Sequence, residues 1–200
     1  MVVLALALAL PAPVLAGEER VIVAFGDSLT AGFGVAPELA WPALLQERLT
    51  REGYPYRVVN AGVSGDTTAG ALRRVSWVLR ARPDVVVVAL GANDGLRGQP
   101  VTAMQANLAE IVSRLQASGP RVLLAGMRLP PNYGTEYTQA FHQAFADVAH
   151  QAKVPLMPFL LDGVAADPRL NQADGVHPNA EGHRRIAEHV WPYLLPLLKK

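Results

Sequence analysis

Short apolar runs recur along the chain, and glycine, proline or polar residues bound each of them. Runs of this length are too short for a typical helix and are typical of strands buried on both faces of a parallel sheet. The run Val85-Val86-Val87-Val88 is the clearest of them. The pattern predicts strands over residues 21–25, 56–62, 84–90, 121–127 and 154–158.

Between these runs, apolar residues recur at the three- and four-residue spacing of amphipathic helices. Pro83 and the pair Gly119-Pro120 follow two of these segments, as expected where a helix ends. The spacing predicts helices over residues 41–49, 67–80, 101–117, 135–152 and 178–198. Alternating strands and helices predict one three-layer α/β/α domain with a parallel sheet in the middle.

The first residues form a separate segment. Residues 1–10 are almost entirely Val, Leu and Ala, and small residues at the spacing of a signal-peptidase site end at Ala16. The apolar run is too short to span a bilayer, so we expect a cleaved export signal over residues 1–16 rather than an anchor. The folded domain is expected over residues 17–200, in the periplasm or outside the cell.

Composition narrows the range of functions. Half of the 200 residues are hydrophobic, 18% are charged and the net charge is +1. A net charge this close to zero, in a sequence without a run of basic residues, does not indicate binding to nucleic acids or to anionic membranes. The chain has no cysteine, which excludes disulfides and thiolate metal sites. We expect a monomer without stable membrane insertion.

Polar clusters with glycine follow three successive predicted strands. They are Gly26-Asp27-Ser28, Ser64-Gly65-Asp66 and the segment over residues 91–94. The carboxyl ends of parallel strands meet at one edge of a sheet, where sites form in such folds. A fourth cluster, over residues 174–179, precedes the last predicted helix and contains His177. The clusters therefore predict one active site at this edge.

Acyl transfer requires a nucleophile, a base, a group that orients the base, and donors for the oxyanion. Ser28 can act as the nucleophile and His177 as its base. Asp174 lies three residues before His177 and can reach its Nδ1–H. The backbone N–H groups of Ser28 and Gly65 and the side-chain amide of Asn93 are the expected oxyanion donors.

Other polar and aromatic residues are assigned structural roles. Asp27, Asp66 and Asp94 are expected to form caps and loop hydrogen bonds. The remaining histidines fall within predicted helices and are expected at the surface or its boundary. Trp41 and Trp77 are expected in the core, and the pair Arg73-Arg74 on a solvated helix face. The histidines concerned are His142, His150, His183 and His189.

In the four polar clusters described above, the chain resembles the SGNH hydrolases, also called the GDSL family, and the resemblance extends from about Arg20 onward. Three further segments resemble a subgroup of bacterial periplasmic thioesterases, lysophospholipases and related arylesterases: residues 40–45, 91–98 and 128–134. The resemblance implies a flavodoxin-like sheet of five parallel strands in the order 2-1-3-4-5. It implies Ser28, Asp174 and His177 as the triad and Ser28, Gly65 and Asn93 as the oxyanion hole.

The resemblance also implies activity on carboxylic esters and acyl thioesters, as small-molecule substrates, without a cofactor or a metal. Met127, Leu129 and Pro130 resemble the part of the subgroup that contacts the acyl chain.

Two alternatives remain open at this stage. The first is a carbohydrate or small-acyl acetylesterase that uses the same triad. The second is a flavodoxin-like ligand-binding module. Against the second, the segment Gly32-Phe33-Gly34 lacks the third glycine of a dinucleotide fingerprint, and the chain has no phosphate-binding P-loop motif.

Overall fold

The computed structural model describes residues 20–200. The expected export signal over residues 1–16 lies outside the described residues. Five parallel strands form one sheet in the order β2-β1-β3-β4-β5, which confirms the order that the family resemblance implied. Their bounds are β1 Arg20–Gly26, β2 Tyr56–Gly62, β3 Val85–Ala89, β4 Arg121–Ala125 and β5 Leu156–Met157.

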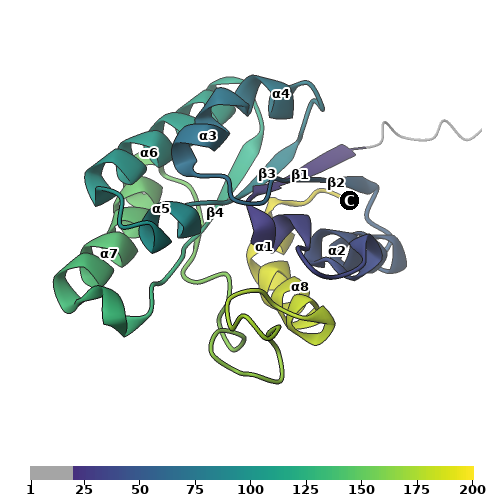
Figure 1. The fold of residues 1–200 in the computed structure, drawn as a ribbon. Helices are drawn as coiled ribbons and strands as arrows, with labels where there is room; N and C mark the ends of the chain where they lie inside the picture. Colours follow the sequence, from purple (N-terminus) through teal and green to yellow (C-terminus); the bar gives the residue numbers. More distant parts are fainter. Residues whose placement is uncertain (1–19) are drawn as a thin grey trace, which may run out of the picture.

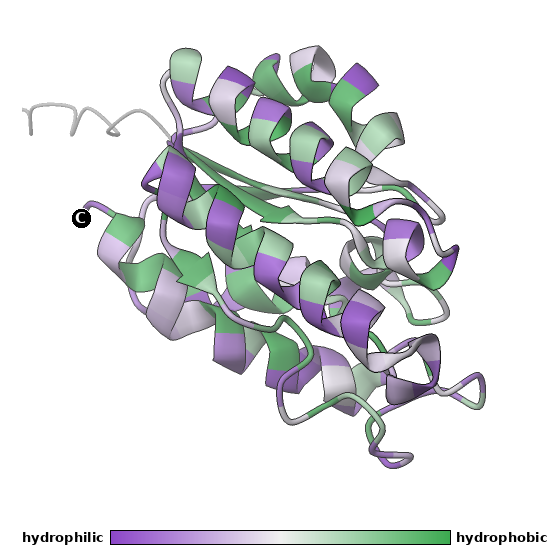
Figure 2. Ribbon diagram, turned by 90° about the vertical axis from the view of Figure 1, so that its left-hand side faces the viewer, coloured by the Kyte–Doolittle hydropathy of each residue, from purple (hydrophilic) through white to green (hydrophobic). Residues whose placement is uncertain are grey.

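Helices cover both faces of the sheet (Figure 1). On one face lie α3 (Thr68–Arg73), α4 (Val75–Leu79), α6 (Val101–Ala117) and α7 (Thr135–Ala152). On the other face lie α2 (Trp41–Arg51) and α8 (Ala180–Leu194). Each covering helix turns an apolar stripe to the strands, and Figure 2 shows largely hydrophobic strands between helices of mixed hydropathy. The three-layer α/β/α architecture is thus confirmed.

The core lies on both sides of the central strands. All five residues of β3 are fully buried, as are Ile22 and Phe25 of β1. Trp41 of α2 and the pair Phe141 and Phe145 of α7 are buried with them, as expected for Trp41. Among the described residues, no helix is long and apolar enough to cross a membrane.

Three local features differ from the prediction. The helix expected over residues 67–80 is divided at Arg74 into α3 and α4. The last strand is shorter than expected, because Pro155 and Pro158 flank Leu156–Met157 and proline has no N–H to donate to a sheet. Two single-turn helices, α1 (Ser28–Ala31) and α5 (Ala92–Leu96), follow β1 and β3.

Trp77 corrects another expectation. This residue lies on α4 with 48% of its surface exposed and is not part of the core. The short helix presents the indole outward, although the neighbouring Val75 and Val78 are buried.

Candidate active site

The ends of three adjacent strands define the position of the site. Gly26 of β1 pairs with Gly62 of β2 on one side and Ala89 of β3 on the other. A side chain at Gly26 would collide with Thr30 and the Ala89 carbonyl, and one at Gly62 with the backbone of Ala31. Glycine at these two ends therefore lets α1 pack directly against the edge of the sheet, with Ser28 as its first residue.

Ser28, His177 and Asp174 form a continuous chain of hydrogen bonds. The Ser28 Oγ lies 2.9 Å from His177 Nε2, and His177 Nδ1 lies 2.7 Å from Asp174 Oδ2. A carboxylate beside Nδ1 favours the tautomer with the proton on Nδ1, which leaves Nε2 free to accept the Ser28 hydroxyl proton. The three residues are thus arranged as a nucleophile, a base and an orienting carboxylate.

Asp174 is held as an anion by its own loop. Its Oδ1 accepts the backbone N–H groups of Val176 and His177, each at 2.9 Å. These bonds, with the His177 side chain, lower the Asp174 pKa to about 2. The carboxylate therefore stays ionised across the neutral range.

The loop that carries His177 is tied at both ends. The Gln172 N–H donates to the His177 carbonyl at 2.8 Å, and Asn179 caps α8 by accepting the N–H groups of Glu181 and Gly182. The Asn179 N–H also donates to the Leu170 carbonyl at 2.9 Å. This network places His177 at the entrance to α8, beside Ser28.

The expected oxyanion donors lie in three segments that follow β1, β2 and β3. Asn93 is the second residue of α5, directly after β3, and its Nδ2 donates to Asp27 Oδ2 at 3.3 Å. Gly65 has a φ of +79°, a conformation that favours glycine. Within the described part of the chain, the N–H groups of Ser28 and Gly65 donate to no acceptor. Both remain available to a bound oxyanion.

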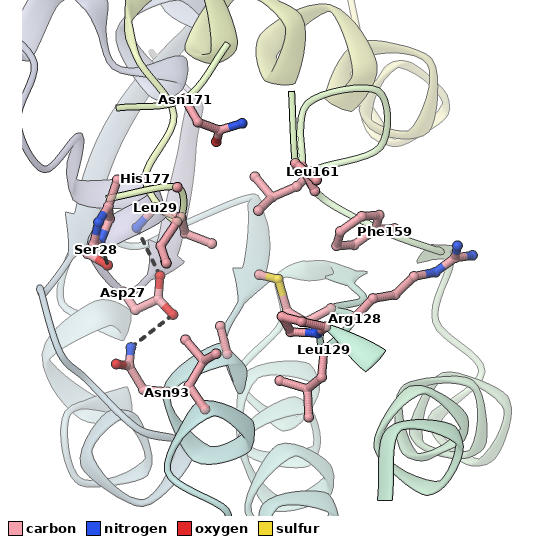
Figure 3. Close-up of a pocket in the computed structure, with 18 of the residues that line it drawn as sticks. Asp27, Ser28, Leu29, Asn93, Arg128, Leu129, Phe159, Leu161, Asn171 and His177 are labelled. Atoms are coloured by element: carbon pink, nitrogen blue, oxygen red, sulfur yellow. Dashed lines mark hydrogen bonds between the residues drawn. The ribbon is translucent and has the colours of Figure 1, made fainter. Parts of the chain in front are cut away.

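Asp27 is fully buried and lies between Ser28 and Asn93 (Figure 3). It caps α1 by accepting the Leu29 N–H at 3.0 Å, as expected for its role as a cap. Burial raises its pKa to about 6, although the bonds from Leu29 and Asn93 act in the opposite direction. This carboxylate fixes one amide hydrogen of Asn93 and so sets the direction of the other.

Asp94 is buried and Asp66 is half-buried, and their carboxylates connect the segments of Asn93 and Gly65 to the rest of the fold. Asp94 accepts both the N–H and the hydroxyl of Thr68, at 2.9 and 2.6 Å. Asp66 pairs with Arg74 at 2.7 Å. Arg74 also donates to the carbonyls of Ala61 and Gly26, each at 2.9 Å. The expectation of a solvated Arg74 was wrong, because the pattern of the helix does not reveal that Arg74 contacts the ends of β1 and β2.

An apolar pocket of about 380 Å³ opens beside Ser28 and His177 (Figure 3). The three residues expected to contact an acyl chain, Met127, Leu129 and Pro130, all line it. The sequence did not single out Phe159, Leu161 or Ala165, which also line the pocket. They follow the two-residue strand β5 in a segment without a helical or strand period, so no pattern marked them.

His183 is also placed differently from the prediction. It is fully buried, and its Nδ1 accepts the backbone N–H of Trp41 at 3.3 Å. Burial, and next the charge of His177, lower its pKa to about 4. The buried stripe of α8 contains His183, Ile186, Val190 and Leu194, and this spacing could have identified it.

Among residues 20–200, no group of His, Cys, Asp or Glu side chains is arranged to hold a metal ion.

Comparison with known proteins links this geometry to a family. Residues 24–185 match the GDSL-like lipase/acylhydrolase family. The chain is 47% identical to "Esterase TesA" of Pseudomonas aeruginosa over 180 residues. The aligned region covers 90% of each of the two chains. It is 38% identical over 178 residues to "Thioesterase 1/protease 1/lysophospholipase L1" of Escherichia coli K12, which covers 88% of this chain and 84% of the relative.

The fold of the chain is also similar to that of a solved structure. The crystal structure of TesA matches with a TM-score of 0.87 and 47% sequence identity, over 90% of this chain and 100% of that one.

Proposed function

The chain belongs to the GDSL-like lipase/acylhydrolase family and is a hydrolase of ester bonds, and we propose that Ser28, His177 and Asp174 carry out its reaction on carboxylic esters and acyl thioesters. One observation carries the proposal. The hydrogen bonds of 2.9 Å and 2.7 Å that connect Ser28 Oγ, His177 and Asp174 lie at the mouth of an apolar pocket.

The first half of the reaction forms an acyl-enzyme. His177 Nε2 takes the Ser28 proton as Oγ bonds to the acyl carbon, and the resulting imidazolium is stabilised by Asp174. When the bond to the leaving group breaks, the same proton passes from Nε2 to the leaving oxygen or sulfur. The second half repeats these steps with water as the nucleophile and releases the carboxylic acid.

The oxyanion of each tetrahedral intermediate lies among the donors of Ser28, Gly65 and Asn93. Donors fixed before the reaction stabilise this charge without reorganising, which is often the largest contribution to catalysis. The bond from Asn93 to Asp27 and the contacts of Arg74 support this preorganisation.

The pocket supports acyl chains longer than acetyl as substrates. Its lining is mostly hydrophobic, including Met127, Leu129 and Phe159, and apolar burial stabilises each added methylene by about 0.8 kcal/mol. We expect kcat/KM for p-nitrophenyl esters to rise from acetate to butyrate and hexanoate. Activity confined to acetate would instead favour the acetylesterase alternative, and the Ser28→Ala variant provides the background rate.

We further propose that the chain is exported and acts as a monomer. The small-residue spacing that ends at Ala16 supports cleavage there, outside the described residues. Mass spectrometry of the protein recovered from the periplasm tests this, since we expect an N-terminus at Gly17. Recovery of the uncleaved chain in the cytoplasm would contradict it.

A further inference from the structure

Phe33 is a large apolar residue beside the proposed catalytic base, but it does not line the acyl pocket. Half of its surface is exposed, and its ring centroid lies 4.7 Å from that of His177 with an angle of 43° between the planes. Few other large apolar side chains among the described residues are as exposed as this one. A single exposed apolar residue is ordinary, so its meaning depends on what fixes it there.

The backbone holds Phe33 against the loop of His177. Gly32 and Gly34 adopt left-handed φ values of +80° and +78°, and this turn projects the side chain between them. The Phe33 N–H donates to the Ser28 carbonyl at 3.1 Å. Gln172 Nε2 donates to the carbonyls of both Phe33 and Pro178, at 2.7 and 2.9 Å. The backbone of Phe33 is therefore held beside Ser28 and the loop of His177, and the ring lies against that of His177.

An ester at Ser28 has two arms that must leave the reacting carbon in different directions. In the proposed function the acyl arm fills the apolar pocket, where Leu129, Phe159 and Leu161 lie on the side away from Ser28 (Figure 3). The leaving group must stay within reach of His177 Nε2, which protonates it. Because the acyl arm occupies the pocket, the leaving group lies beyond its rim at His177. The His177 ring lines the pocket and also contacts Phe33, which does not line it.

We propose that Phe33 is a specificity-determining residue, a platform on which an aromatic leaving group stacks during acylation, so that the enzyme favours esters of phenols over those of alkyl alcohols. This inference rests on the proposed function and assigns its leaving-group side. The glycine pair that fails as a dinucleotide fingerprint thereby has a role as the support of this ring. Aromatic rings gain from offset or edge-to-face contact beyond the area that they bury.

The test compares two substrates with the same acyl group, phenyl butyrate and ethyl butyrate, through acid release in a pH-stat. Both pass through the same butyryl-enzyme, so a leaving-group contact affects acylation and the ratio of the two kcat/KM values. We expect Phe33→Leu to lower the phenyl-to-ethyl ratio roughly two- to tenfold. Phe33→Tyr, which keeps the ring, should keep the ratio.

Trp77→Leu is the matched control, because Trp77 is equally exposed and lies on α4, among residues that do not line the acyl pocket. It should leave the ratio unchanged. Equal loss on both esters in Phe33→Leu would overturn the inference, since it would show that Phe33 only packs against His177. An unchanged ratio would overturn it as well. Failure of the unaltered enzyme to hydrolyse either ester would instead contradict the proposed function.

Discussion

Asn93 has two amide hydrogens, and Asp27 binds one of them. The other is then directed by a buried carboxylate rather than by solvent, which is the condition for a preorganised oxyanion donor. The same carboxylate caps α1, so a single side chain orients the donor and begins the helix that carries Ser28.

Replacing Asn93 tests this donor. Asn93→Ala should lower kcat by about 10²–10³-fold, because one donor to the oxyanion is lost. The melting temperature should change little, since Asn93 is only partly buried and its bond to Asp27 is long. Steady-state turnover of p-nitrophenyl butyrate with thermal unfolding checks both points. Near-full activity would contradict the assignment.

Asp174 should matter through the tautomer of His177. Asp174→Asn places an amide where the carboxylate accepts the Nδ1 proton and favours the unproductive tautomer, so kcat should fall by about 10⁴-fold. Fluorescence or circular dichroism should show a folded protein. A loss of less than tenfold would show that another group orients His177.

Among the helices and strands, the division between α3 and α4 bears directly on the site. Arg74 lies at the break, where its side chain binds Asp66 and the carbonyls at the ends of β1 and β2. A continuous helix would satisfy the local pattern but would leave these strand ends without this donor. The bonds hold the loop of Gly65 against the strand ends.

Neighbouring arginines provide a controlled comparison. Arg74→Gln leaves Asp66 half-buried without its partner and should lower the free energy of unfolding by about 3 kcal/mol, with a fall in kcat. Arg73 is exposed and makes one bond, to the Ala69 carbonyl of its own helix. Arg73→Gln should therefore cost less than about 0.5 kcal/mol. Equal effects in denaturant unfolding would contradict the clamping role of Arg74.

The elements show how far local sequence predicts this fold. Helices α6 and α7 were predicted with the bounds that the structure shows, because they are long and strongly periodic. The single-turn helices α1 and α5 were not, since contacts from distant residues fix them. The polar clusters after three strands predicted that Ser28, Gly65 and Asn93 lie at one edge, because parallel strands end there. The cluster before the last helix predicted His177, which the structure places beside Ser28. Arg74 was assigned wrongly because its partners are distant in sequence, whereas the helical spacing of the buried residues of α8 could have placed His183 in the core.

At the scale of the whole molecule, two buried groups make opposite contributions to stability at mildly acidic pH. The Asp27 pKa is raised to about 6 in the folded protein, which binds more protons than the unfolded chain between pH 3.8 and 6. Its contribution to stability therefore grows as pH falls through that range. The His183 pKa is lowered to about 4 from 6.5, so the unfolded chain binds more protons and stability falls over nearly the same range.

Replacing either Asp27 or His183 should reveal the effect of the other group's titration on stability. Asp27→Asn should lose stability relative to the unaltered protein as pH falls from 6 to 4, by about 2 kcal/mol, because one pKa unit corresponds to about 1.4 kcal/mol and most of the shift from 3.8 to about 6 develops in this window. His183→Gln, which keeps an acceptor for Trp41, should show the opposite trend. Urea unfolding at several pH values measures both. Parallel pH profiles for the three proteins would contradict the opposed titrations.

The role proposed for Ser28 is that of the nucleophile of an ester hydrolase. The most direct test is labelling of the purified protein with a fluorophosphonate, beside Ser28→Ala, while p-nitrophenyl butyrate turnover is followed in both. We predict that the unaltered protein labels and turns over substrate, and that both properties vanish together in a folded Ser28→Ala variant. Labelling that persists in Ser28→Ala, or an unaltered protein that neither labels nor turns over, would contradict the account.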